Sequence, residues 1–277
     1  TSTTQAMSEE DLAERMSFFL NLIETSPDYK DVWITQKEVK EMISKTEKLG
    51  FIKPTLIASK KIYRPTPDQI ATLSFYKNNI AHLYMLYSLI CESVKFVKSA
   101  PKQEIINLIE MIYPIFAKDF HLKKKIIHQE DIADTINILK NNGLLNEDGK
   151  GNILSPDENS PYFQNYIALS NLCEPSLKRF YIVMHTMWQS ESTQKEDLNT
   201  RCKELAEKLE EIEGWPYPEF SDKAKFNNFV YMMKETKFFK EDERGYLSAS
   251  KITKRAKKLY EQFFDKDFLE FINTQTS

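Results

Sequence analysis

The strongest constraint on the fold of this chain is a pattern of apolar residues that recurs twice, each time 93 residues further along. Its three occurrences are Leu12, Met16, Phe19 and Ile23; Ile105, Ile109, Ile112 and Phe116; and Leu198, Cys202, Leu205 and Leu209. Apolar residues at this spacing lie on one face of an amphipathic helix. The recurrence predicts three copies of one small unit, over residues 1–100, 101–192 and 193–277, because the period exceeds that of a solenoid repeat. Chance agreement among amphipathic helices is the alternative.

Each copy continues in the same order after its first helix. A second helix is predicted to start near Thr35, His128 or Ser221 and to end near Gly50, Gly143 or Lys237. Glycine suits the left-handed residue that ends many helices, and Lys237 departs from this pattern. Turn-rich stretches between short apolar runs then predict β-hairpins near residues 51–64, 144–154 and 238–247. A long helix closes each copy, so the predicted fold is mainly α, with three winged-helix-like units of helix, helix, β-hairpin and helix.

Composition supports a helical fold and narrows the function classes. Six glycines in 277 residues are few for an α/β protein, and 41% hydrophobic residues are enough for a buried core. The formal net charge of -3 argues against nonspecific nucleic-acid binding. The three cysteines form no CxxC pair and the four histidines are scattered, so we expect no disulfide framework, no metal and no cofactor. With no secretory signal and no apolar stretch long enough for a bilayer, a cytoplasmic location is expected.

The last predicted helix combines an apolar face with four closely spaced cations. The cations are Lys254, Arg255, Lys257 and Lys258. A basic amphipathic helix of this kind is a candidate for binding an anionic membrane surface. The alternative, which we favour, is that the apolar face packs against its own unit.

A polar group interrupts the apolar helix that closes the first copy. Its members are Tyr76, Lys77, Asn78, Asn79 and His82. Asparagine is a poor helix former, and residues three and four apart on a helix lie on the same side. We expect Asn78, Asn79 and His82 to form a buried polar cluster, with docking against another domain as the alternative. A direct substrate role ranks last, since Lys77 is the single nearby cation for a phosphate.

This segment, FYKNNIAH from Phe75 to His82, resembles a stretch of the bacterial glycerol-3-phosphate acyltransferases. Two further stretches resemble the same family, in the same order: LKRFYIV from Leu177 and PEFSDKAKF from Pro218. The resemblance covers essentially the whole chain and places it in the C-terminal region of those enzymes. It implies a parent enzyme of phospholipid synthesis that moves an acyl group from acyl carrier protein or acyl-coenzyme A to glycerol 3-phosphate. It also implies a location at the cytoplasmic face of the bacterial inner membrane.

The family's catalytic motif, H-x-x-x-x-D, can be tested against each histidine. In that motif the histidine acts as general base and the aspartate orients its ring. The residues five positions after the four histidines are Tyr87, Ile126, Ala133 and Ser190, none of which is an aspartate. We therefore expect no catalytic residue in this chain, no acylation by the chain alone, and an upstream acyltransferase domain that holds the motif.

Three function hypotheses follow. The first is a non-catalytic accessory region of the acyltransferase, with the upstream catalytic domain as partner and acyl carrier protein or an anionic membrane surface as further candidates. The second is a free-standing interaction module without enzyme activity. The third, a winged-helix nucleic-acid binder, ranks last because the predicted second helices carry mixed charge, as Lys37, Glu38, Lys40 and Glu41 illustrate.

Overall fold

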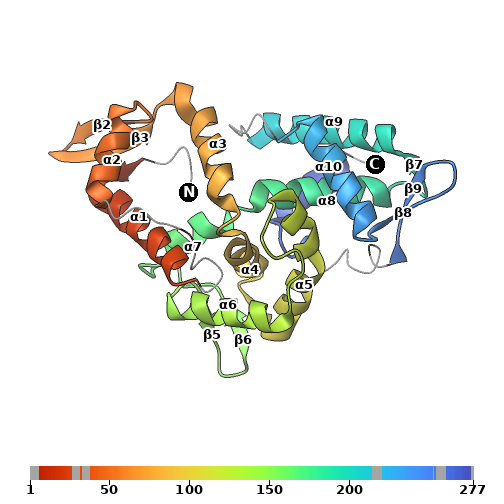
Figure 1. The fold of residues 1–277 in the computed structure, drawn as a ribbon, viewed down its shortest axis with the longest axis horizontal. Helices are drawn as coiled ribbons and strands as arrows, with labels where there is room; N and C mark the ends of the chain where they lie inside the picture. Colours follow the sequence, from red (N-terminus) through yellow and green to blue (C-terminus); the bar gives the residue numbers. More distant parts are fainter. Residues whose placement is uncertain are drawn as a thin grey trace. The chain divides into compact units, whose positions relative to one another are not determined.

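The computed structural model describes residues 6–26, 32, 38–213, 220–251, 253 and 260–275. As predicted, this part of the chain is mainly helical with small antiparallel sheets. It divides into two compact units, Thr1–Tyr84 and Met85–Ser277 (Figure 1).

The first compact unit has helices on either side of one small sheet in chain order. Its elements are β1 (Met7–Ser8), α1 (Glu9–Glu24), α2 (Val39–Lys48), β2 (Ile52–Ile57), β3 (Lys60–Pro65), the short 3-10 helix η2 (Pro67–Gln69) and α3 (Ile70–Ala81). Helix α1 begins where the Ser8 hydroxyl accepts a hydrogen bond from the Asp11 amide at 3.0 Å. Leu22, Ile43 and Tyr63 are buried between α1, α2 and the sheet.

The second compact unit contains the remaining elements. They are α4 (Met85–Lys95), β4 (Ser99–Pro101), α5 (Lys102–Asp119), α6 (Gln129–Asn141), β5 (Asn146–Glu147), β6 (Asn152–Leu154), α7 (Phe163–Ser170), α8 (Glu174–Trp188), β7 (Thr193–Gln194), α9 (Lys195–Glu213), α10 (Lys223–Glu235), β8 (Phe239–Glu241), β9 (Tyr246–Ala249) and α12 (Lys266–Thr274). Helices α4, α5, α8 and α10 pack at its centre, where aromatic rings such as Phe116, Phe180 and Phe229 contact one another. Within the described residues, no helix combines the length and apolarity that crossing a bilayer requires.

All three predicted hairpins are present, as β2–β3, β5–β6 and β8–β9. The prediction of two-stranded hairpins was incomplete, because each gains a third strand just before a helix. The strand orders β1-β3-β2, β4-β6-β5 and β7-β9-β8 are therefore the same in all three sheets. The added strands are two or three residues long, which is too short for the alternation of apolar and polar residues that reveals a strand.

The prediction of one long closing helix per copy was wrong for the first two copies. The first is split into α3 and α4 by a turn over residues 82–84, and the second into α7 and α8 by a turn over residues 171–173. In the second turn the amide of Cys173 donates to the Ser88 hydroxyl at 3.0 Å, and that bond replaces one along the helix. Since α4 packs against α5, α6 and α7, it lies in the second compact unit although the sequence assigned it to the first copy.

Two of the predicted helix starts lie within the described residues. Helix α6 begins after His128, as predicted. Helix α10 was predicted to start near Ser221 and begins after Asp222, whose carboxylate accepts a hydrogen bond from the Ala224 amide at 2.8 Å. Thr35, the predicted start in the first copy, lies outside the described residues.

The second helix of every copy ends in the same hydrogen-bonded motif. The left-handed residue donates to the carbonyl three residues back, and the next residue donates to the carbonyl five residues back. The left-handed residues are Gly50 (φ 79°), Gly143 (φ 70°) and Lys237 (φ 63°). The backbone therefore adopts the same motif at Lys237, where the sequence has no glycine.

Replacing Lys237 by glycine is expected to raise the free energy of unfolding by about 1 kcal/mol, because a side chain in the left-handed region is strained. The reciprocal change, Gly50→Lys, should lower it by a similar amount, since a residue with a Cβ would take φ 79°. Urea denaturation followed by circular dichroism measures both. A loss of stability in Lys237→Gly would contradict the strain argument.

Candidate functional site

The polar residues singled out from the first copy all lie on or directly after α3. Tyr76 is exposed, and its ring contacts Phe51 edge to face at 5.7 Å between centroids. Lys77 and His82 are half-buried, whereas Asn78 and Asn79 are exposed. The prediction of a buried polar cluster was therefore wrong. The buried residues of α3 are the small Ser74 and Ala81, so only a narrow strip of this helix is covered and both amides reach solvent.

The exposed side of α3 is nevertheless rich in apolar surface. Phe75 is 62% exposed and Ile80 is 52% exposed, and they lie beside the two asparagines. A helix that is apolar on its exposed side as well as its buried side normally meets a second surface. We define Phe75, Tyr76, Asn78, Asn79 and Ile80 as the α3 surface.

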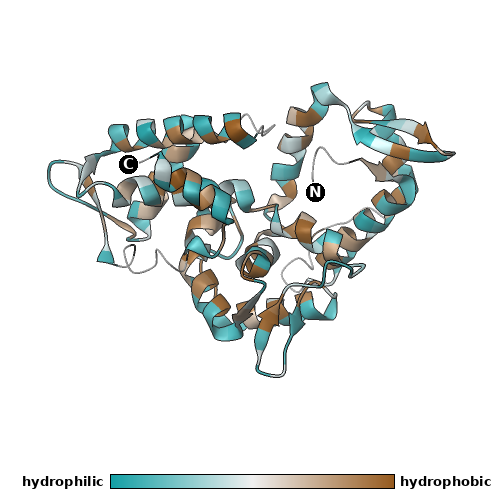
Figure 2. Cartoon of the chain, turned by 180° about the vertical axis from the view of Figure 1, so that it is seen from behind, coloured by the Kyte–Doolittle hydropathy of each residue, from teal (hydrophilic) through white to brown (hydrophobic). Residues whose placement is uncertain are grey.

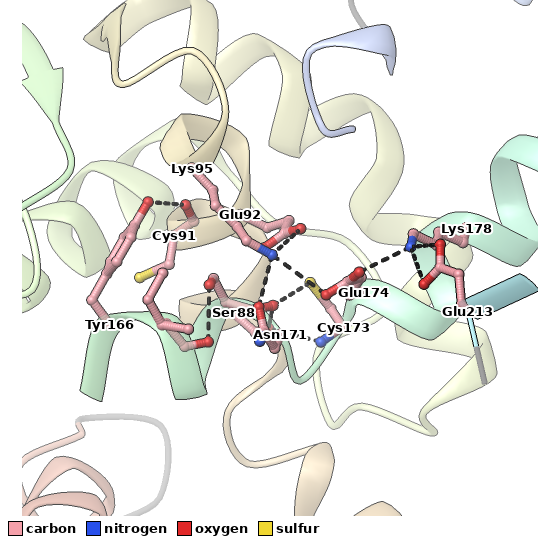
Figure 3. A network of polar contacts seen from close by, with 12 residues as sticks. Ser88, Cys91, Glu92, Lys95, Tyr166, Asn171, Cys173, Glu174, Lys178 and Glu213 are labelled. Atoms are coloured by element: carbon pink, nitrogen blue, oxygen red, sulfur yellow. Dashed lines mark hydrogen bonds and ion pairs between the residues drawn. The ribbon is translucent and has the colours of Figure 1, made fainter. Parts of the chain in front are cut away.

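A second polar site, which the sequence analysis missed, lies inside the second compact unit (Figure 3). The Lys95 ammonium donates to Asn171 Oδ1 at 2.7 Å, to Glu92 Oε1 at 3.2 Å and to Glu174 Oε2 at 3.4 Å. The Lys178 ammonium lies 3.1 Å from Glu174 Oε1 and 2.9 Å from Glu213 Oε1. Glu174 thus joins the two lysines into one chain of charges. We call Glu92, Lys95, Glu174, Lys178 and Glu213 the ionic network.

The ionic network connects all three predicted copies of the repeat. Glu92 and Lys95 come from α4, Glu174 and Lys178 from the first turns of α8, and Glu213 from the end of α9. Neighbouring neutral bonds join α4 to α7, the helix just before α8. The Ser88 hydroxyl donates to the Ser170 carbonyl at 3.1 Å, and the Tyr166 hydroxyl donates to the Cys91 carbonyl at 3.0 Å. These bonds fix where α8 begins against α4.

The ionic network contains more carboxylates than ammonium groups, and this excess affects the protonation of Glu92. Three carboxylates face two ammonium groups, and Glu92 is 1% exposed. Its second oxygen, Oε2, is buried and has no hydrogen-bond partner among the described residues. Burial raises the pKa of Glu92 to about 7, against the opposing effect of Lys95. Burial acts the same way on the pKa of Glu174, but there Lys95 and Lys178 outweigh it and the pKa is lowered.

This arrangement suits a structural role better than a catalytic one. The nearest thiols, Cys91 and Cys173, are fully buried, and burial raises the pKa of each well above its ordinary value. A thiol held in this way is a poor nucleophile. Among the described residues, no group of three or more histidine, cysteine or carboxylate side chains is placed to hold a metal ion.

Two of the stretches that carried the family resemblance meet in this unit. Arg179, from LKRFYIV, is buried with its guanidinium 5.8 Å from the ring centre of Phe220, from PEFSDKAKF. It also donates to the Ser176 hydroxyl at 3.0 Å and lies 5.9 Å from the ring centre of Phe229. The neighbouring Lys178 belongs to the ionic network. These stretches therefore place buried cations at helix contacts.

The sequence does contain a signal for the ionic network, in the form of charged pairs that interrupt apolar helices. Glu92 and Lys95 interrupt a strongly apolar helix at a spacing of three, and Glu174 and Lys178 repeat the pattern at a spacing of four. Charged pairs inside apolar helices indicate buried ion pairs. The other cations singled out from sequence, Lys254, Arg255, Lys257 and Lys258, lie outside the described residues.

Comparison with known proteins gives a consistent result. Residues 1–242 match the family described as "Glycerol-3-phosphate acyltransferase C-terminal region". A curated protein from Alteromonas mediterranea named "Glycerol-3-phosphate acyltransferase" is 29% identical over 252 residues, which cover 90% of this chain and 30% of that protein. Proteins of the same name from Haemophilus influenzae and Pasteurella multocida are 25% and 24% identical, over 93% and 87% of this chain and 32% and 30% of their own length. The chain thus spans about a third of the length of these relatives.

Proposed function

Because the chain belongs to the family of glycerol-3-phosphate acyltransferase C-terminal regions, we propose that it is a non-catalytic accessory part of such an acyltransferase. We propose further that the α3 surface docks it onto the catalytic part. The family match over residues 1–242 carries the first proposal. In this proposal the enzyme moves an acyl group onto glycerol 3-phosphate at the cytoplasmic face of the membrane.

Two observations support docking through α3. The curated relatives are about three times longer than the matched region, so in them a large further part is available as a partner. The α3 surface offers exposed aromatic and aliphatic side chains with two adjacent amides, a mixture typical of protein interfaces. None of the four histidines is followed by an aspartate five residues later, so the general base of the proposed reaction must come from elsewhere in the enzyme.

Phe75→Ala with Ile80→Ala, made in a full-length enzyme that carries this region, is expected to lower acyltransferase activity at least about tenfold, as loss of a docking contact would. Both side chains are more than half exposed, so the same pair should change the unfolding free energy of the 277-residue chain alone by less than about 1 kcal/mol. Activity assays with acyl-coenzyme A and glycerol 3-phosphate, beside denaturation curves, measure the two effects.

The matched control is Ile126→Ala with Ile212→Ala, two exposed isoleucines of the second compact unit. An equal loss of activity in the control would contradict docking through α3. Turnover by the 277-residue chain alone, above a blank, would contradict the non-catalytic role.

We also propose that residues 1–100, 101–192 and 193–277 are three winged-helix-like units of common origin. The repeated strand order and the repeated helix-ending motif support this. Superposing the three segments in an experimental structure tests it, since a different order of aligned helices would contradict common origin.

A further inference from the structure

The β2–β3 hairpin differs in charge from the other two hairpins of the same chain. Residues 48–67 contain five basic residues and no acidic residue, in a chain whose formal net charge is -3. The basic residues are Lys48, Lys53, Lys60, Lys61 and Arg64. The turns of the other hairpins are acidic, with Glu147 and Asp148 in one and Glu241, Asp242 and Glu243 in the other. The other two hairpins can therefore serve as an internal comparison for the charge of the β2–β3 hairpin.

The β2–β3 hairpin is also longer and more exposed. Its strands have six residues each, against two to four in the hairpins β5–β6 and β8–β9. Five of the six residues of β2 are exposed. Its two-residue turn, Ala58–Ser59, has both residues in the left-handed region, with φ of 48° and 65°. That geometry makes a tight hairpin end.

Strand register gathers the cations on one side of the hairpin. Ile57 pairs with Lys60, and Lys53 pairs with Arg64. Paired residues lie on the same face of an antiparallel ribbon, and residues two apart share a face. Lys53, Ile57, Lys60 and Arg64 therefore share one face, while Tyr63 lies on the opposite face and is buried in its own unit. Lys61, also on that opposite face, forms an ion pair with Glu9 at 4.0 Å.

The tip of the hairpin is aliphatic. Leu56 is 74% exposed, the highest value among the large apolar side chains of the described residues, and Ile57 is 50% exposed. Figure 2 shows hydrophobic and hydrophilic residues side by side along this hairpin. By the strand register Leu56 lies on the same face as Lys61 and Ile57 on the same face as Lys60, so each aliphatic side chain of the tip has a cation opposite it on its own face. Aliphatic surface exposed at such a tip favours a partner that removes it from water.

We propose that the β2–β3 hairpin is a membrane-contact element that binds anionic phospholipid. Leu56 and Ile57 enter the boundary between headgroups and acyl chains, and Lys53, Lys60 and Arg64 lie against the phosphates. An anionic bilayer offers both an apolar layer for the tip and a negative surface for the cations. Nucleic acid offers the negative charge but no apolar layer, which leaves the exposed leucine unexplained. This inference rests on the hairpin alone and holds whether or not α3 docks onto another domain.

Sedimentation of the 277-residue chain with lipid vesicles tests the proposal. We expect binding to vesicles of phosphatidylcholine with phosphatidylglycerol and much weaker binding to phosphatidylcholine alone. Lys53→Glu with Lys60→Glu should weaken binding at least about tenfold, since each cation at the surface contributes to the attraction. Leu56→Ser with Ile57→Ser should also weaken vesicle binding at least about tenfold, since the two aliphatic side chains that would be buried in the bilayer are lost.

The control is Lys150→Glu with Arg244→Glu, at the exposed turns of the other two hairpins. It changes net charge by the same amount as the double lysine variant, so it should retain binding. Circular dichroism melts verify that every variant is folded.

The proposal is overturned if the unchanged chain does not bind anionic vesicles, or if the control loses binding equally. It is also overturned if binding depends on Lys254 and Lys257 and not on the hairpin. Binding to duplex DNA or acyl carrier protein in place of vesicles would overturn it as well.

Discussion

Lys178→Met is expected to lower the free energy of unfolding by about 3–5 kcal/mol. The Lys178 side chain is 3% exposed and lies between Glu174 and Glu213, at 3.1 and 2.9 Å. Its ammonium also lies 5.1 Å from the ring centre of Phe268. Methionine keeps the length of the side chain but removes the charge, so Glu174, whose side chain is 20% exposed, is left with Lys95 as its one cation in the ionic network. A carboxylate that is largely shielded from water and loses a cation is the main cost of such a change.

Lys203→Met is the matched control for this prediction. Lys203 forms an ion pair with Glu207 at 2.9 Å on the same helix as Glu213, but both side chains are more than 40% exposed. Exposed pairs contribute little, so this change should cost less than about 1 kcal/mol. Glu174→Gln in the Lys178→Met background should recover part of the loss, because it removes the unpaired charge. Urea denaturation measures all three, and equal losses at Lys178 and Lys203 would contradict the buried network.

Glu92→Gln is expected to remove a pH dependence of stability between about pH 4.5 and 7. In the folded chain burial raises the pKa of Glu92 from 4.5 to about 7. Between these values the folded state binds more protons than the unfolded state, so the free energy of unfolding falls as pH rises through this window. The total fall is on the order of 3 kcal/mol, and above about pH 7 this group adds no further slope.

Glutamine imitates the protonated carboxyl and leaves two carboxylates facing two lysines. We therefore expect Glu92→Gln to be more stable than the unchanged chain at pH 8, by about 1–3 kcal/mol, and to show a flat curve from pH 5 to 7. The lowered pKa of Glu174 acts in a separate window, since its contribution is lost as pH falls below its unfolded pKa.

Denaturation curves across pH, compared with Glu213→Gln as control, test this prediction. Glu213 belongs to the same ionic network, but its side chain is 26% exposed. The control should keep the slope between pH 5 and 7. A slope that persists unchanged in Glu92→Gln would show that another group causes it.

The sequence by itself determined the helical class, the three hairpins and the family. Each follows from local information: the spacing of apolar residues, the turn residues near 59–60, 147–151 and 241–245, and three short stretches that resemble one family. The apolar pattern recurs every 93 residues, so the prediction of a hairpin after one occurrence supported the prediction of a hairpin after the other two. At Lys237 the glycine is absent, yet the helix ends with the same hydrogen bonds and the same left-handed backbone.

The tertiary structure decided which polar residues are buried. Asn78 and Asn79 have the spacing of a buried cluster but are exposed, because the buried strip of α3 in the described structure is limited to Ser74 and Ala81. Glu92, which no sequence motif singled out, and Lys178, which was quoted only within the stretch LKRFYIV, are both buried although they are 86 positions apart in the chain. Helical periodicity shows which residues share a face of one helix, whereas burial depends on what other helices bring to that face. For that reason the sequence of each helix alone could not show that the charged residues of α4, α8 and α9 form one ionic network, because the network depends on how the three helices pack.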